Sequence, residues 1–298
     1  MTRIAYVNGE FVPLTEARVS ILDRGFLFAD GIYEVTAVLD GGLVDHGHHM
    51  ARLKRSLGEI GLSCPAGEEE LTRLQLELLR RNGLTEGTLY LQVTRGAAER
   101  DFRFPGTDIP SSLVMFTQAR DLVDNPDART GIAVKSVPDL RWKRRDIKSI
   151  ALLAQVLAKQ EAAAAGCAEA WMVEDGFVTE GASSSAFIIT RQRALIARPL
   201  GHEILPSVTR ISVLKLAEEQ DLKIESRRFS LQEAHDAQEA FNCSAGGLVM
   251  PVICIDGSNI GQGVPGDITK RLRQIYIEHA RQTVISNNNS YIRSFPDI

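Results

Sequence analysis

The sequence predicts a mixed fold of helices and strands, α+β in its first part and α/β in character after it, arranged as two domains. Three observations carry this expectation. Alternating apolar segments meet at turn signals such as Asn8-Gly9 and Asp175-Gly176, which predicts β-hairpins. Other segments place apolar residues three and four positions apart, which predicts amphipathic helices. A polar stretch at 120–131 separates two groups of such elements, so we expect domains at 1–119 and 132–298 joined by this linker.

The first domain is expected to combine antiparallel strands with two helices. Hairpins are predicted at 4–14 and 31–47, because each alternating segment is interrupted by a turn signal. The stretch 67–84 is predicted as a helix because its acidic start and basic end suit the helix dipole. The other expected elements are a helix within 48–62 and strands within 87–99 and 111–120.

The second domain is expected to follow a similar mixed pattern. The stretch 149–166 is predicted as a helix, with Ser149 as its N-cap and Gly166 as its stop. A hairpin is predicted at 169–181, around Asp175-Gly176. The remaining expected elements are strands at 132–142, 184–190, 194–200 and 239–257 and helices at 206–222 and 266–282.

The composition excludes several classes of protein. The 298 residues carry a net charge of −4, which gives no basic footprint for nucleic acid. No segment has the form of a signal peptide or approaches the ~18 apolar residues of a membrane span. The four cysteines have no CxxC spacing, which favours reduced thiols in a cytoplasmic protein. His46, His48 and His49 lack a partner at metal-ligand spacing, so we expect a solvated turn followed by a helix start, and no metal there.

One lysine stands where the chain changes from charged to apolar. Lys148 follows the sequence "RRDI" and precedes a long apolar run. A lysine in this place either extends to solvent with its stem on apolar surface, or is a buried amine with chemistry to perform. Taken alone, the first interpretation is favoured, because buried lysines are rare.

Two segments could receive a phosphate group. Val208 and Thr209 follow Ser207 at an expected helix start, where backbone N–H groups attract anions. The small residues Ser244, Ala245 and Gly246 form a loop that a phosphate or a planar ligand could approach closely. Taken alone, each segment is better explained as an ordinary helix start or a tight turn.

Two further charged residues complete a possible cofactor site. Glu180 follows a strand and could face a cationic ring nitrogen, although a surface turn is the simpler interpretation. Arg52 lies on a helix, opposite or beside its apolar stripe, and alone suggests only a solvated arginine. Pyridoxal phosphate needs a lysine for a Schiff base, a carboxylate for its ring nitrogen and a cradle for its phosphate. Lys148, Glu180, Arg52 and the helix start at Val208 supply this set.

Several longer stretches resemble one known family. They are "DRGFLFADGIYEV", "HHMARL", "LQVTRG", "RRDIKSIALLAQVLAKQEA", "VTEGASSSAF" and "LPSVTR". Together they resemble the fold-type IV pyridoxal-phosphate aminotransferases, and within them the D-amino acid transaminases most closely. The resemblance covers nearly the whole chain. It implies a smaller N-terminal α+β domain, a larger C-terminal domain, the cofactor in the cleft between them, and a homodimer.

The resemblance also implies roles for individual residues. Lys148 matches the catalytic lysine that holds the cofactor, and Glu180 matches the partner of the ring nitrogen. Phosphate contacts are implied for Arg52, Val208 and Thr209. Further cofactor contacts are implied for Ser183 and for Leu205 against one face of the ring, together with Ser244 and Ala245. The substrate side is implied for Tyr33, Arg100, Phe102 and Gly246, with Arg100 matching an arginine that binds the substrate α-carboxylate.

The sequence departs from the D-amino acid transaminase pattern at three places. Phe102 stands where that pattern has a histidine, which leaves the carboxylate trap incomplete. Ala245 and Gly246 stand where a pair of threonines is usual, and this loop is more similar to that of the (R)-selective amine transaminases. Ser185 replaces an asparagine, with no consequence that we can name. Arg100 and the stretch around Lys148 keep the D-amino acid transaminase form.

These features predict a ping-pong transaminase that moves an amino group from a D-amino acid such as D-alanine to pyruvate or α-ketoglutarate. The alternative is an (R)-selective amine transaminase with pyruvate as acceptor. A lyase of the aminodeoxychorismate type shares the fold and cofactor, but the form of the chain around Lys148 disfavours it. A non-catalytic binding protein on the same scaffold is disfavoured by the complete cofactor set.

Overall fold

The structure is a computed structural model that describes residues 2–284. The described chain forms two compact units that are not contiguous in sequence. Unit 1 comprises residues 2–121, 147–151 and 280–284, and unit 2 comprises 122–146 and 152–279. The boundary after Asp121 lies inside the segment expected as a linker, which holds the short helix α4 (Pro126–Thr130). Lys148 belongs to unit 1, although the segments that flank 147–151 on both sides belong to unit 2.

Unit 1 is built on a sheet that has six strands within the described residues, in the order β2-β1-β6-β5-β3-β4 with every pair antiparallel. The first hairpin turns at Asn8-Gly9, whose positive φ angles of 49° and 106° suit the twist of the strands. The strands are β1 (Ile4–Val7), β2 (Glu10–Pro13), β3 (Gly31–Leu39), β4 (Gly42–Leu43), β5 (Gly87–Thr94) and β6 (Ser112–Ala119).

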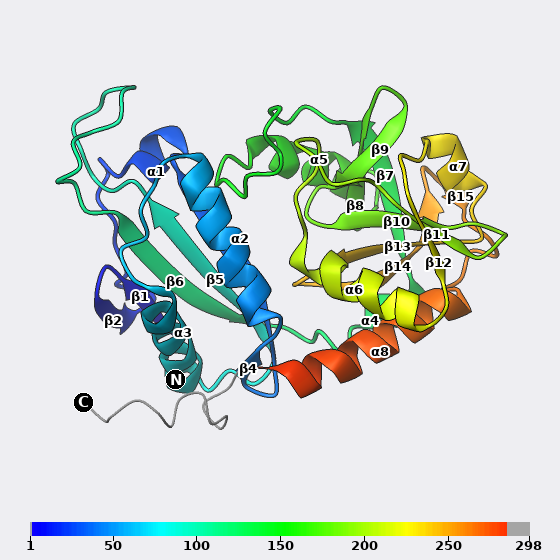
Figure 1. The fold of residues 1–298 in the computed structure, drawn as a ribbon, viewed down its shortest axis with the longest axis horizontal. Coiled ribbons are helices and arrows are strands. Elements are labelled where there is room, and N and C mark those ends of the chain that lie inside the picture. Colours follow the sequence, from blue (N-terminus) through cyan, green and yellow to red (C-terminus); the bar gives the residue numbers. More distant parts are fainter. Residues whose placement is uncertain (1, 285–298) are drawn as a thin grey trace. The chain divides into compact units, whose positions relative to one another are not determined.

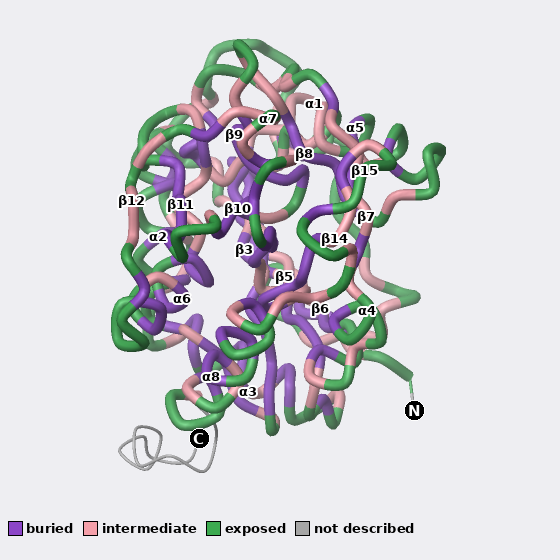
Figure 2. The backbone as a smooth tube through the Cα atoms, turned by 90° about the vertical axis from the view of Figure 1, so that its right-hand side faces the viewer, coloured by how far each residue is buried: buried purple, intermediate pink, exposed green. Residues whose placement is uncertain are grey.

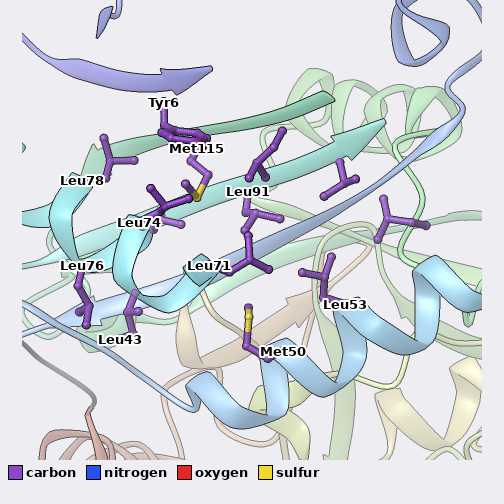
Figure 3. Packing of buried hydrophobic residues seen from close by; sticks show 14 of the residues in the cluster. Tyr6, Leu43, Met50, Leu53, Leu71, Leu74, Leu76, Leu78, Leu91 and Met115 are labelled. Carbon is purple, nitrogen blue, oxygen red and sulfur yellow. The ribbon is translucent and has the colours of Figure 1, made fainter. Parts of the chain in front are cut away.

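Two helices bury their apolar faces on this sheet (Figure 1). α3 (Glu68–Asn82) begins with three glutamates and ends at Gly83 in the left-handed region, as its charge pattern predicts. α2 (His46–Glu59) packs against β3. Figure 3 shows Leu71, Leu74 and Leu78 of α3 beside Tyr6 and Met115 of the sheet. The short helix α1 (Arg24–Phe28) precedes β3 and is capped by Asp23.

Unit 2 contains a mixed sheet of nine strands within the described residues, in the order β12-β11-β10-β13-β14-β7-β8-β9 with β15 on β14. Parallel pairing joins β11 to β12, β14 to β7 and β7 to β8. Figure 2 shows β10 buried along its length. The strands are β7 (Ile132–Pro138), β8 (Glu169–Glu174), β9 (Phe177–Gly181), β10 (Ser185–Ile189), β11 (Ala194–Ala197), β12 (Lys223–Ser226), β13 (Glu239–Ser244), β14 (Leu248–Ile255) and β15 (Ser258–Asn259).

The helices of unit 2 are α4 together with α5 (Leu153–Ala164), α6 (Val208–Glu219), α7 (Leu231–His235) and most of α8 (Asp267–Thr283), whose residues from Ala280 onward are assigned to unit 1. The expectation that a helix begins after Ser149 is wrong, because α5 begins at Leu153. Its stop at Gly166 is confirmed, since Gly166 has a φ of +72° and the Cys167 N–H donates to the Ala162 carbonyl at 2.8 Å. No helix formed by residues 2–284 is long and apolar enough to cross a membrane.

Candidate active site

The backbone around Lys148 pairs with β3 instead of forming a helix. Ser149 forms an antiparallel bridge with Ile32. The Tyr33 N–H donates to the Lys148 carbonyl at 3.1 Å, and the Lys148 N–H donates to the Ser56 hydroxyl at 3.3 Å. These bonds explain why the helix starts later, because the residues before it already use their polar groups in pairing with a strand. The lysine is therefore held at both its backbone polar groups.

The Lys148 side chain is half-buried and faces an aromatic ring. Its Nζ lies 4.1 Å from the centroid of the Tyr33 ring, which in turn stacks on Tyr90 at 5.6 Å. An ammonium group over a ring face gains a modest electrostatic attraction. No carboxylate among residues 2–284 forms an ion pair with this Nζ. Within residues 2–284, the contact given for this amine is therefore with an aromatic ring and not with an acid.

Arg52 is buried, not solvated, and its position is fixed by an acid on β3. Its Nε and Nη2 donate to the two oxygens of Glu34 at 2.8 and 2.7 Å, and His49 Nδ1 lies 2.7 Å from the same carboxyl. Burial works to raise the pKa of Glu34, but Arg52 and His49 outweigh it and hold this pKa at about 2. The two parallel bonds to Glu34 fix the orientation of the guanidinium plane.

The histidine cluster is only partly in solvent, so the expectation of a solvated turn is wrong for two of its members. His46 and His49 are buried, while His48 is exposed. His46 Nε2 lies 2.8 Å from the Thr72 hydroxyl of α3. Burial, with a smaller effect of His49, lowers the pKa of His46 to about 4. Both buried rings therefore join α2 to its neighbours by hydrogen bonds.

In unit 2, Glu180 is the second-last residue of β9 and is buried. Its Oε1 forms an ion pair with Nη1 of Arg141, and both carboxyl oxygens accept the N–H of Leu205 at 3.2 and 3.3 Å. Burial raises the pKa of Glu180, while Arg141 and the Leu205 N–H oppose this by favouring the ionised form. Glu180 is not the surface turn that its sequence context allowed.

Arg141, which pairs with Glu180, was not expected from the sequence. It precedes Lys148 by seven positions, in the charged stretch "DLRWKRRDIK". Asp139 holds it through Nε and Nη2 at 3.0 and 2.7 Å, and Asp139 also accepts the Thr179 hydroxyl at 2.6 Å. The alternation of charges in that stretch was the available signal, but it did not reveal that Glu180 is the second partner.

The helix start expected as an anion site is present. Ser207 caps α6, because its hydroxyl accepts the Arg210 N–H at 3.3 Å. Val208 and Thr209 occupy the first turn, where N–H groups have no acceptor within the helix. The loop after β13 is a tight turn, in which the Gly247 N–H donates to the Ser244 carbonyl at 3.3 Å. A Cβ atom added at Gly246 would meet no atom within 4 Å.

Ser183 lies in the turn between β9 and β10 and is held by an acid. Its hydroxyl donates to Glu169 at 3.0 Å, and the Ser184 hydroxyl donates to the same oxygen at 3.1 Å. Glu169 also pairs with Lys159 of α5 at 2.9 Å. This turn directly follows Glu180, so Glu169 helps to fix the chain at that carboxylate.

Arg100 lies on the exposed loop between β5 and β6 and stacks on rings. Its guanidinium carbon is 5.2 Å from the Phe28 ring centroid and 5.4 Å from that of Phe102. Phe102 is 78% exposed, so it contributes no buried packing of its own. No ion pair joins Arg100 to an acid in the described part of the chain. A guanidinium carries five N–H donors and no acceptor.

The expected site residues divide between the units. Unit 1 holds Lys148, Arg52, Tyr33, Arg100 and Phe102, and unit 2 holds Glu180, Ser183, Leu205, Val208, Thr209, Ser244, Ala245 and Gly246. Their chemistry fits pyridoxal phosphate on three observations. The Lys148 amine lacks an acidic partner within residues 2–284. Oε2 of the buried Glu180 accepts one long hydrogen bond from the Leu205 N–H within the same residues. The start of α6 has N–H groups that can bind an anion.

Comparison with known proteins identifies the family. Residues 31–255 match the family model described as amino-transferase class IV. The D-alanine aminotransferase of Staphylococcus aureus (strain N315) is 38% identical over 269 residues, covering 90% of this chain and 95% of the relative. That of Bacillus licheniformis is 38% identical over 268 residues, covering 89% and 93%.

A solved structure agrees on the fold. The branched-chain aminotransferase of the thermophilic archaeon Thermoproteus uzoniensis, solved with norvaline, aligns with a TM-score of 0.80 at 26% identity, covering 93% of this chain and 94% of that one. The predicted mixed fold and the predicted family are both confirmed. The chain belongs to the class IV aminotransferases, a family of pyridoxal-phosphate-dependent transaminases.

Proposed function

We propose that this enzyme transfers the amino group of a D-amino acid such as D-alanine to a keto acid, pyruvate or α-ketoglutarate, by a ping-pong mechanism. The observation that carries the proposal is Lys148, whose backbone is fixed on β3 and whose amine has no acidic partner within the described residues. The choice of D-amino acids is supported by the D-alanine aminotransferases, which are similar over about nine tenths of the chain.

Each site residue has a proposed task. When bound, pyridoxal phosphate supplies an electron sink for the bond that breaks at the substrate carbon. Lys148 Nζ would hold the cofactor and would move a proton at that carbon. The Glu180 carboxylate meets the ring nitrogen. Arg52 and the N–H groups at Val208 and Thr209 bind the phosphate.

Further contacts with the cofactor and the substrate are proposed from smaller observations. Leu205 packs against the ring, and its N–H fixes Glu180 at 3.2 and 3.3 Å. Ser183, oriented by Glu169, lies in the turn after Glu180. Tyr33 borders the substrate, because its ring already faces the Lys148 amine. Ser244 and Ala245 add to the phosphate site, and Gly246 leaves room on the substrate side.

Arg100 is the proposed ligand of the substrate carboxylate, because a guanidinium binds a carboxylate through two parallel hydrogen bonds. The alternative substrate is an (R)-amine that lacks a carboxylate. Phe102 favours it, since an exposed phenyl ring provides apolar contact where a histidine would provide a hydrogen bond. The two substrate classes give Arg100 different roles. A D-amino acid offers its guanidinium a carboxylate, whereas an (R)-amine has no carboxylate to bind.

A substrate panel tests the proposal. The purified enzyme is given pyruvate as acceptor, with deuterium-labelled D-alanine, D-glutamate or (R)-phenylethylamine as donor; turnover of D-alanine is read as transfer of its methyl label into pyruvate. We expect activity with both D-amino acids and a strong loss of it in Arg100→Gln. Arg103→Gln, on the same exposed loop, is the control. Activity with the amine and none with either D-amino acid would transfer the assignment to the alternative.

We also propose that two copies of the chain associate. The segment 19–26 and the loop 96–104 are joined by hydrogen bonds, including Arg24 N–H to the Gly96 carbonyl at 2.9 Å. Together they expose large apolar side chains, an arrangement that soluble monomers rarely leave uncovered. These side chains are Val19, Ile21, Leu22, Phe26, Phe102 and Phe104, which are 37% to 78% exposed. Sedimentation should give a dimer, and Phe26→Ser should weaken it.

The compartment is proposed from the cysteines. Cys64, Cys167, Cys243 and Cys254 are all free thiols. Unpaired cysteines persist in reducing surroundings, which supports a cytoplasmic enzyme. Fractionation of the producing cells should recover the transaminase activity with the cytoplasmic proteins.

A further inference from the structure

Glu180 uses its two carboxyl oxygens unequally. Oε1 pairs with Arg141 Nη1 and also accepts the Leu205 N–H at 3.2 Å. Among residues 2–284, Oε2 accepts only that same N–H, at 3.3 Å. A carboxylate oxygen can accept more than one hydrogen bond, so Oε2 is able to take a further donor.

Arg141 is itself held rigidly on its other side. Its Nε and Nη2 donate to Asp139 at 3.0 and 2.7 Å, and its backbone N–H donates to the same carboxyl at 3.2 Å. The Asp139 side chain is fully buried and lies 3.3 Å from Arg145 Nη1. Arg145 then pairs with Glu174 at 2.8 Å. Acidic and basic side chains therefore alternate from the partly exposed Glu174 to the buried Glu180. Their order is Glu174, Arg145, Asp139, Arg141 and Glu180.

We propose that Arg141 is a positioning residue that holds Glu180 ionised through Oε1 and leaves Oε2 for the ring nitrogen of the cofactor, so that the proton they share stays on the ring. This inference rests on the proposed function. A proton between a carboxylate and a ring nitrogen can reside on either group. Burial alone favours the neutral carboxyl and would draw the proton to Glu180.

The position of Arg141 decides this competition. Its guanidinium touches Oε1, so it lies nearer to the carboxylate than to a donor bound at Oε2. It therefore stabilises the negative carboxylate more than it repels a positive ring nitrogen. Asp139 offsets this less, because it binds the opposite edge of the guanidinium. Arg210 of α6, which is buried and interacts electrostatically with Glu180, acts in the same direction as Arg141.

The test reads the proton directly. Wild-type protein and variants are reconstituted with pyridoxal phosphate labelled with nitrogen-15 in the ring, and the ring-nitrogen resonance is recorded at pH 7. We expect a protonated ring nitrogen in the wild type and an unprotonated one in Arg141→Gln. Arg141→Lys keeps the positive charge and should restore protonation. Arg129→Gln, which removes an exposed arginine of the same unit, should match the wild type.

A second variant guards against misfolding of Arg141→Gln. The double variant Arg141→Gln/Asp139→Asn removes both charges of the pair, so position 139 does not keep a buried negative charge that has lost Arg141. This variant should also lose ring protonation. A protonated ring nitrogen in either variant would overturn the role of Arg141. If the wild-type protein binds no cofactor at all, the proposed function fails; if it binds cofactor and the variants keep the proton, only this inference fails.

Discussion

The buried ion pair of Glu34 with Arg52 gives the sharpest stability prediction. Glu34 is 1% exposed, and its pKa is about 2 instead of the 4.5 of an unperturbed glutamate. At about 1.4 kcal/mol per pH unit, this difference corresponds to roughly 3 kcal/mol of folding stability at pH 7. Because the pKa is lowered on folding, this stability is complete above pH 4.5 and is lost as the pH falls toward 2. By pH 3, about 2 kcal/mol of it should be gone.

Glu34→Gln removes the charge and leaves Arg52 without its buried acidic partner. At pH 7 we expect the free energy of unfolding of the variant to be lower by about 3–5 kcal/mol, the usual cost of breaking a buried pair. The assay is urea unfolding followed by circular dichroism at pH 7 and pH 3. Between pH 7 and pH 3, the free energy of unfolding should fall by about 2 kcal/mol less in the variant than in the wild type. Glu70→Gln, which breaks an exposed pair with Arg73, is the control and should change stability by less than about 1 kcal/mol. An equal loss with pH in wild type and Glu34→Gln would refute the reasoning.

Three further outcomes follow from single side chains. The pKa of His46 is lowered to about 4 on folding, so the unfolded chain binds its proton first as the pH falls. The wild type should therefore lose about 2 kcal/mol of unfolding free energy between pH 7 and pH 5, and His46→Asn should lose less, as measured from unfolding midpoints. Trp171→Phe removes a fully buried indole N–H that donates to Asn242 at 2.7 Å, and denaturation should show a loss of about 2–3 kcal/mol; an unchanged midpoint would contradict the buried bond. Phe102→His should raise the ratio of D-alanine to (R)-phenylethylamine activity, and an unchanged ratio would mean that Phe102 does not set the preference.

Local features of the fold were predictable from the sequence. Asn8-Gly9 and Asp175-Gly176 specify tight turns, because both positions adopt positive φ, and the structure has hairpins at both. The charge pattern of α3 and its stop at Gly83 were equally local. Each of these signals depends on residues within a few positions of one another, so one stretch of sequence contains all of the information.

Features that depend on distant partners were not predictable in this way. Ser149 has the form of an N-cap, but pairing of its segment with β3 delays the helix to Leu153. His46 and Arg52 suggest solvent when taken alone, and only Thr72 and Glu34 explain their burial. Lys148 stands out by its change of context, although that context alone favours a lysine that extends to solvent. The pairing of Glu180 with Arg141 spans 39 positions, so no short stretch of sequence could indicate it.

The central claim is that Lys148 holds the cofactor. Protein reconstituted with pyridoxal phosphate is reduced with borohydride, digested, and searched by mass spectrometry for the modified lysine. We predict a phosphopyridoxyl group on Lys148 and none in Lys148→Ala. Lys159→Ala, which removes a lysine of α5, should keep the modification. Absence of the group from Lys148, or its presence on another lysine, would contradict the account.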